Sequence, residues 1–162
     1  MRVEQTPLKD CFIIRDTLYK DPRGYFFESL NRQKFNELTG LNVDFVQDNQ
    51  SKSTKGVLRG LHFQLGEHAQ AKLVRVLEGK VLDVAVDIRP NSKTFGQHVA
   101  IELTAENQTQ LFVPRGFAHG FLVLSDTATF AYKVDNTYAP EFDVGIRWND
   151  KELNIQWGME DS

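Results

Sequence analysis

The stretch KLVRVLEGKVLDVAVDIR, residues 72–89, predicts a β-hairpin and points to the class of the fold. Residues 72–77 and 81–89 are rich in strand-forming side chains, and the segment 78–80 between them holds a glycine suited to a turn. In the second run, apolar residues from Leu82 to Ile88 alternate with a set that includes Asp83 and Asp87. This period of two predicts a strand between an apolar core and a more polar space.

Outward from this hairpin, short strand-like stretches separated by turn residues fill most of the chain. They cover residues 11–16, 24–29, 44–50, 56–64, 97–103, 110–114, 121–124, 127–136 and 145–148. One short helix is expected over 32–38, with Asn31 as its N-cap and Gly40 ending it. Because no repeat or linker interrupts the pattern, we predict a single domain, 1–162. Its fold class is all-β, a cupin-like double-stranded β-helix (jelly-roll barrel).

The composition narrows the function classes. With 41% hydrophobic and 25% charged residues the chain is typical of globular proteins rather than disordered ones. A net charge of −3 argues against broad nucleic-acid binding, although a locally basic pocket could still hold a nucleotide. We expect a cytoplasmic protein without a membrane span, because Cys11 has no cysteine to pair with and neither a signal peptide nor a run of about 18 apolar residues occurs.

The segment VLRGLHFQ, residues 57–64, is the richest in candidate chemistry. In a regular strand Arg59 and His62 would face opposite sides. A β-bulge at Gly60 would add one residue and turn both side chains to the same face. The alternative is a surface arginine and a histidine that only forms hydrogen bonds within the sheet.

Three further positions leave a structural and a chemical reading open. His119 follows a turn and could be a hydrogen-bonding prop, with Asp83 as the acid that orients it. Tyr132 shares a strand face with apolar residues and could be a core tyrosine whose hydroxyl needs a partner. Lys72 opens an apolar strand, where a solvated strand end is the default.

A metal site is not expected. Many cupins bind a metal through clustered histidines, and such a site needs three or four converging ligands. The four histidines here do not form any His-x-His pair, and His62 stands alone between Leu61 and Phe63.

Taken together, seven segments resemble the dTDP-4-dehydrorhamnose 3,5-epimerase family, in family order and over about residues 11–157. They are DPRGYFFE (21–28), FVQDN (45–49), VLRGLHFQ (57–64), KLVRV (72–76), DVAVDIR (83–89), PRGFAHGF (114–121) and RWND (147–150). The resemblance implies an isomerase of deoxysugar biosynthesis that acts on a dTDP-linked 4-keto-6-deoxyhexose. Such an enzyme needs no cofactor, because the ketone of the substrate is itself the electron sink.

The resemblance also implies roles for individual residues. His62 matches the general base, Tyr132 the acid opposite it, and Lys72 the cation near the enolate oxygen. General acid–base help of this kind contributes about 10²–10⁴-fold to a rate. The residues that the resemblance places on the substrate are Arg23 and Arg59 at the diphosphate, Glu28, Gln47, Asp48 and Asn49 at the nucleotide or sugar, His119 at the sugar with Asp83 supporting it, Tyr138 at the base, and Asp143.

Two departures from the family pattern affect the expected activity. Family members generally continue into a Leu-Ser-x-Lys-Asp segment, whose Asp pairs with the catalytic histidine, whereas this sequence ends at Ser162. Position 143 is commonly Glu in the family and is the shorter Asp143 here. We therefore expect His62 to have a weaker partner or none, and turnover to be low or confined to one carbon.

The resemblance implies a homodimer, in which the N-terminal strands cross the interface and Arg23 and Glu28 serve the neighbouring subunit's site. Two other functions remain open. The chain could be a single-site epimerase or a 3,4-ketoisomerase on a related nucleotide sugar. It could also be a catalytically silent protein that binds sugar nucleotides.

Overall fold

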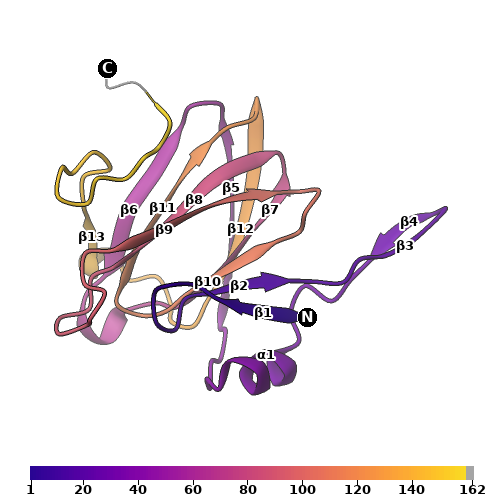
Figure 1. The fold of residues 1–162 in the computed structure, drawn as a ribbon, viewed down its shortest axis with the longest axis horizontal. Coiled ribbons are helices and arrows are strands. Elements are labelled where there is room, and N and C mark those ends of the chain that lie inside the picture. Colours follow the sequence, from indigo (N-terminus) through magenta and orange to yellow (C-terminus); the bar gives the residue numbers. More distant parts are fainter. Residues whose placement is uncertain (160–162) are drawn as a thin grey trace.

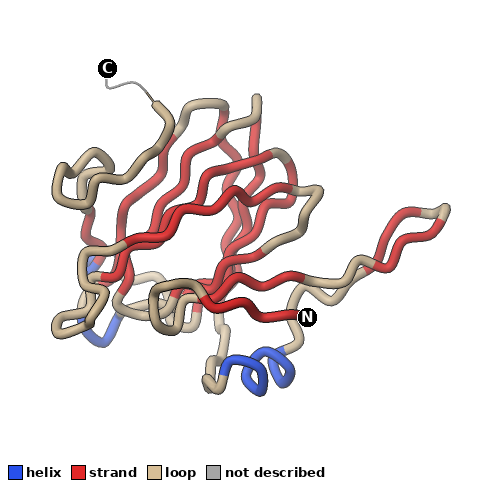
Figure 2. Tube along the Cα trace, viewed as in Figure 1, coloured by secondary structure: helices blue, strands red, loops and turns tan. Residues whose placement is uncertain are grey.

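The computed structural model describes residues 1–159. Within these residues the chain forms thirteen β-strands, one α-helix and two short 3₁₀ helices (Figures 1 and 2). The strands are β1 (Arg2–Gln5), β2 (Phe12–Arg15), β3 (Tyr19–Asp21), β4 (Gly24–Phe26), β5 (Gln47–Thr54), β6 (Leu58–Gln64), β7 (Lys72–Glu78), β8 (Lys80–Asp87), β9 (His98–Thr104), β10 (Gln110–Val113), β11 (Phe117–Val123), β12 (Thr127–Val134) and β13 (Asp143–Gly145). The helices are α1 (Arg32–Thr39) and the 3₁₀ turns Gly66–His68 and Pro140–Phe142.

Two antiparallel sheets make up the body of the fold. One has six strands in the order β1-β2-β10-β7-β12-β5, and the other has five in the order β13-β6-β11-β8-β9. From β5 to β13 the chain passes from one sheet to the other at every step except between β8 and β9, as in a jelly roll. The predicted all-β, cupin-like barrel with one α-helix is therefore confirmed.

The core between the sheets follows from the two-residue period of the strands. Val74 and Val76 of β7 meet Phe121 of β11 and Phe130 of β12 in one buried cluster. The rings of Phe121 and Phe130 stack across the sheets with their centroids 4.1 Å apart. Every second residue on these strands therefore points into the barrel.

The outer faces of both sheets are also covered. Helix α1 lies over the six-stranded sheet and packs Phe35 edge-on against Phe112, with ring centroids 5.1 Å apart. Residues 146–157 cover the five-stranded sheet, where Trp157 packs in one cluster with Val84 and Val86 of β8. Strand β8 is consequently buried on both faces, and the face that holds Asp83 and Asp87 is the inside of the barrel.

A β-bulge interrupts the pairing of β6 with β11. His62 pairs with His119 and Arg59 pairs with Phe121, so two residues on β6 lie opposite the single Gly120 on β11. A Cβ atom on Gly60 would lie 2.6 Å from the Gly120 Cα atom, which explains the glycine. The predicted bulge at Gly60 is confirmed.

The hairpin of β3 and β4 extends away from the two large sheets (Figure 1). It exposes Tyr19, Tyr25 and Phe26 by 65%, 58% and 68%, respectively. Because an isolated two-stranded hairpin is at best marginally stable in water, we expect this β3–β4 arm to need another surface to pack against.

The predicted elements agree with the structure in type more than in extent. The helix has its predicted caps, with the Asn31 side chain accepting from Lys34 N–H and Gly40 left-handed at φ 72°. Strands β1 and β3 were not predicted, and β11 begins at Phe117 rather than at residue 121. The space beside Asp83 is less polar than expected, since Val81 and Ala85 on the same face belong to the apolar core. The predicted domain runs to residue 162, of which 160–162 lie outside the described residues.

Candidate active site

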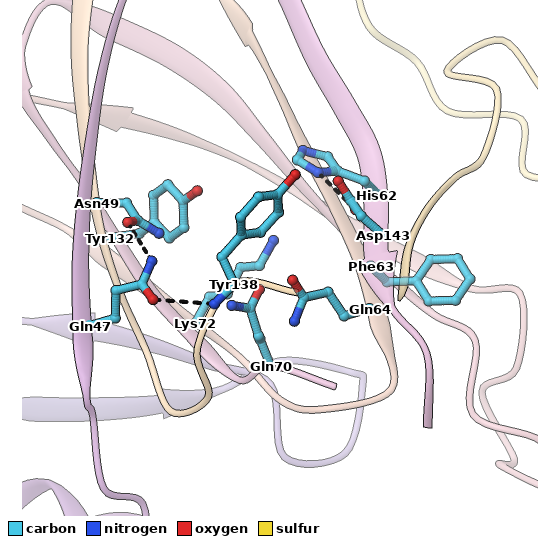
Figure 3. Close-up of a pocket in the computed structure, with 10 residues that line it drawn as sticks. All are labelled: Gln47, Asn49, His62, Phe63, Gln64, Gln70, Lys72, Tyr132, Tyr138 and Asp143. Carbon is cyan, nitrogen blue, oxygen red and sulfur yellow. Dashed lines mark hydrogen bonds and ion pairs between the residues drawn. The ribbon is translucent and has the colours of Figure 1, made fainter. Parts of the chain in front are cut away.

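A cavity of about 310 Å³ opens between the two sheets (Figure 3). It is lined by side chains from β5, β6, β7, β12, β13 and the loops beside them. They are Gln47, Asn49, His62, Phe63, Gln64, Gln70, Lys72, Tyr132, Tyr138 and Asp143. A second chamber of about 150 Å³ is lined by Asn49, Gln50, Ser51, Arg59, His62, Lys72, His119, Phe121, Phe130 and Tyr132. The two share Asn49, His62, Lys72 and Tyr132, which therefore mark their junction.

The period of each strand explains why these polar groups meet. Lys72 has the parity of Val74 and Val76, which face inward, and Tyr132 has that of Phe130. The bulge at Gly60 brings His62 to the inner face as well. His62 thus approaches from the five-stranded sheet, while Lys72 and Tyr132 approach from the six-stranded sheet (Figure 3).

His62 is a partly buried base with a loosely held acid beside it. Its Nδ1 lies 3.8 Å from Oδ1 of Asp143, and its side chain is 41% exposed. Burial and, to a smaller extent, the neighbouring charge of Lys72 lower the pKa of His62 to about 4, while Asp143 opposes the shift. The pKa of His62 therefore lies well below the value near 6.5 of an unperturbed histidine. His62 is neutral at neutral pH and free to accept a proton.

Lys72 is buried rather than a solvated strand end, with only 7% of its surface exposed. Burial lowers its pKa to about 8, and the carboxylates of Asp83 and Asp143 partly oppose this shift. Its Nζ lies 5.6 Å from the centre of the Tyr132 ring. At neutral pH the cavity thus holds an ammonium group in surroundings that exclude most water, where its charge acts strongly on a developing anion.

Tyr132 is a cavity residue more than a core residue. Burial raises the pKa of its hydroxyl, and a hydrogen bond from Asn49 opposes the shift. The hydroxyl therefore keeps its proton at neutral pH and can donate it.

His119 and Asp83 form the second histidine–aspartate pair of the site. Nε2 of His119 lies 2.6 Å from Oδ1 of Asp83, and both side chains are at least 95% buried. The imidazole stacks on Phe130 with centroids 6.0 Å apart. Asp83 does orient His119, as the sequence predicted.

Gln47, Asn49 and Tyr138, which the resemblance placed at the nucleotide or sugar, line the larger cavity. Gln47 donates from Nε2 to Oδ1 of Asn49 at 2.8 Å and accepts the backbone N–H of Tyr138 at 3.2 Å. Tyr138 lines the same cavity and is 57% exposed. Arg59 lines the second chamber, where its Nε donates to Oγ of Ser53 at 2.8 Å.

Comparison with known proteins places the chain in a family. The sequence model of dTDP-4-dehydrorhamnose 3,5-epimerase matches residues 5–162. The dTDP-4-dehydrorhamnose 3,5-epimerase of Escherichia coli K12 is 55% identical over 157 residues, which cover 97% of this chain and 85% of that protein. This chain belongs to the dTDP-4-dehydrorhamnose 3,5-epimerase family.

Solved structures of the dTDP-4-dehydrorhamnose 3,5-epimerase family share the whole fold. The crystal structure of the Elizabethkingia anophelis enzyme is 60% identical with a TM-score of 0.96, over 99% of this chain and 88% of that one. The structure of the Legionella pneumophila enzyme in complex with dTDP-4-keto-L-rhamnose is 48% identical with a TM-score of 0.95, over 99% and 85%.

Three residues that the resemblance to this epimerase family assigned to the substrate lie away from the cavity. Asp48 faces outward because β5 alternates, and it pairs with Lys133 at 2.7 Å. Arg23 is at the tip of the extended hairpin, paired with Asp21, and its side chain is 90% exposed. Glu28 contacts Asn31 and Lys34 near α1. Within one chain, none of these three residues lines the cavity.

Several cavity residues were not singled out from the sequence. Gln47, Asn49, Ser51 and Ser53 occupy alternate positions of β5, and this polar period could have predicted that Ser51 and Ser53 face inward. Gln64 has the same parity as His62 on β6, which is a weaker signal. Gln70 lies in a loop and had no signal in the sequence.

The described residues do not include a metal-binding cluster. Nowhere in residues 1–159 do three or more His, Cys, Asp or Glu side chains converge as they would around an ion. Over the same residues, the helices are all too short or too polar to cross a bilayer.

Proposed function

We propose that residues 1–162 form one epimerase domain that inverts C3 and C5 of a dTDP-linked 4-keto-6-deoxyhexose. The observation that carries this proposal is the placement of His62 and Tyr132 on opposite walls of one cavity, with Lys72 beside Tyr132. Inversion requires that a proton leave one face of a carbon and return to the other. A base and an acid on facing sheets match that requirement. The Legionella relative, solved with dTDP-4-keto-L-rhamnose, supports the substrate class.

The chemistry proceeds through an enolate. Neutral His62 takes the proton from the carbon next to the C4 ketone, and the C–H electron pair forms a C=C bond while the carbonyl electrons move to O4. The Tyr132 hydroxyl then gives its proton to the opposite face of the carbon, and the C4 carbonyl reforms. Solvent reprotonates Tyr132 and takes the proton from His62. The ketone accepts and returns the electron pair, so the step itself needs no redox cofactor.

Lys72 has an electrostatic role in this scheme. Its ammonium group stabilises the negative charge that develops on O4, a contribution that is among the largest in enzymes of this kind. Because the buried group has a pKa of about 8, it is charged at neutral pH and loses this role in alkaline solution.

The remaining cavity residues would hold the nucleotide. Arg59 supplies a guanidinium group suited to the diphosphate oxygens. Gln47 and Asn49 present amides toward the sugar or the base, and Tyr138 offers an exposed ring on which the base can stack.

We also propose that two copies of the chain form a dimer through the β3–β4 arm. The arm exposes three aromatic rings and carries Arg23 at its tip. Docked on a second copy, it could bring Arg23 and Glu28 to that copy's cavity. Mixing inactive Arg23→Ala and His62→Ala proteins should then restore activity, since each mixed dimer regains one intact site. Mixtures that stay inactive while forming mixed dimers would count against this arrangement.

Deuterium uptake from D₂O tests the reaction directly. Incubation with dTDP-4-keto-6-deoxyglucose should label both C3 and C5, as read by NMR. Label at one carbon would make the chain a single-site epimerase, and no label would make it a silent binder. A product whose ketone has moved to C3 would identify a 3,4-ketoisomerase.

A further inference from the structure

Gln64 lies at the end of β6, two residues after His62, and is 5% exposed. All the hydrogen bonds of its amide go to backbone groups. Nε2 donates to the carbonyl oxygens of His68 at 2.7 Å and Thr137 at 3.2 Å, and Oε1 accepts the N–H of Ala139 at 2.8 Å. One buried side chain therefore ties the end of β6 to two loops.

Two of these bonds bracket Tyr138. They hold the residue before it and the residue after it, while the N–H of Tyr138 itself donates to Oε1 of Gln47 at 3.2 Å. Tyr138 lines the cavity and is exposed, yet its backbone is fixed from both sides. Without Gln64, only the bond to Gln47 among these three would remain.

Asp143 depends less on Gln64, although it follows a few residues later. Strand β13 pairs with β6 through its backbone, with Asp143 opposite Gln64 itself and Gly145 opposite His62. The N–H of Leu65 also donates to the Phe142 carbonyl at 3.0 Å. The position of Asp143 beside His62 is thus secured by the main chain.

We propose that Gln64 is a positioning residue that holds Tyr138 in place to stack on the base of the nucleotide. The position requires an uncharged amide, because it must donate twice and accept once. A glutamate would present a carboxylate to two carbonyl oxygens, and an apolar side chain would remove the partner of three backbone groups. This inference rests on the proposed function, which assigns the nucleotide to the Tyr138 end of the cavity.

Binding of dTDP, measured by calorimetry, tests this inference in a double-mutant cycle. Removing a stacked aromatic ring costs about 1–3 kcal/mol per base, so Tyr138→Ala should weaken binding about tenfold. Gln64→Met should weaken it to a similar extent, and the double variant should be no weaker than the weaker single variant. Because Asp143 stays in place, KM should rise while kcat changes less than about twofold. Backbone amides of residues 137–139 should exchange hydrogen faster in Gln64→Met.

Gln108→Met is the matched control. Gln108 is also buried and its Nε2 donates to a backbone carbonyl, that of Ala105 at 2.6 Å, but it lies outside the cavity lining. Its variant should bind dTDP as the parent does. If Gln64→Met does not fold, Gln64→Glu provides the test. Its dTDP affinity should improve relative to the parent as the pH falls, because a protonated carboxyl regains one donor.

Three results would overturn the inference. They are an unchanged dTDP affinity in a folded Gln64 variant, effects of Gln64→Met and Tyr138→Ala that simply add, and a Tyr138→Ala protein that binds dTDP normally. In each case the deuterium uptake of the parent protein still decides the proposed epimerase reaction separately.

Discussion

The site has two histidine–aspartate pairs that differ in the distance between their partners and in burial. His119 and Asp83 lie 2.6 Å apart and are almost wholly buried. His62 and Asp143 lie 3.8 Å apart, with side chains 41% and 30% exposed. The two histidines are nevertheless cross-strand neighbours, paired directly in the register of β6 and β11.

This difference assigns a structural role to one pair and a chemical role to the other. A short hydrogen bond in a buried site fixes the orientation of His119. The loosely paired His62 can gain and lose a proton beside the open cavity. The tight pair of His119 and Asp83 therefore supports the wall of the second chamber, whereas the loose pair of His62 and Asp143 is suited to proton transfer.

The sharpest way to break this comparison is to remove His62. We expect His62→Ala to reduce deuterium uptake at both carbons by about 10³-fold or more, in line with the upper range for a general base. Binding of dTDP should be largely retained, since Arg59 and Tyr138 remain. NMR of the labelled sugar and calorimetry of dTDP binding provide the two measurements.

His98→Ala is the control for this substitution. His98 lies on β9 and is not part of the cavity lining, so its variant should exchange at the parent rate. Parent-like exchange in His62→Ala would eliminate His62 as the base.

Replacing the buried Asp83 should lower the free energy of unfolding. Asp83→Asn keeps the shape of the side chain but replaces a charged acceptor, and hydrogen bonds to charged groups contribute about 1.5–3 kcal/mol. We expect a loss of about 2 kcal/mol in the free energy of unfolding, measured by urea denaturation. Asp83 also raises the pKa of Lys72, so the variant should lose activity at a lower alkaline pH than the parent. Unchanged stability would show that the tight pair is not a structural support.

The pH dependence of kcat/KM sharpens the same comparison, because it reports groups of the free enzyme. His62 must be neutral to accept a proton, so activity should fall as the pH drops through about 4. Lys72 must be charged, so activity should fall as the pH rises through about 8. At pH 5 the neutral fraction of His62 is about thirtyfold larger than that of a histidine with the ordinary pKa near 6.5. An acidic limb near 6.5 would show that burial does not control His62.

The sequence predicted the barrel because it depends on local alternation, and Gly60 indicated the bulge that turns His62 inward. Alternation alone favoured a solvated strand end for Lys72 and a core position for Tyr132, and only the family resemblance assigned both residues to the site. What alternation cannot reveal is which strand face another segment covers. Residues 146–157 bury the outer face of β8, and the hairpin carries Arg23 far from the cavity, and both facts depend on long-range packing. The low pKa of His62 likewise depends on burial and on the charge of Lys72, which comes near His62 only in the folded chain.

The smallest effect is expected for Asp143. At 3.8 Å its carboxylate is beyond ordinary hydrogen-bond length from His62, so it orients the imidazole only weakly. Asp143→Asn should therefore reduce kcat by only about threefold, since a longer-range charge contact contributes under about 1 kcal/mol. Asp143 raises the pKa of both His62 and Lys72, so its removal should move both limbs of the pH profile toward lower pH. Glu141→Gln, which removes an exposed acid from the preceding 3₁₀ turn, should move neither limb. If Asp143→Asn reduced the rate as much as His62→Ala does, the loose pair would be working as a tight catalytic unit, and the contrast between the two pairs would not hold.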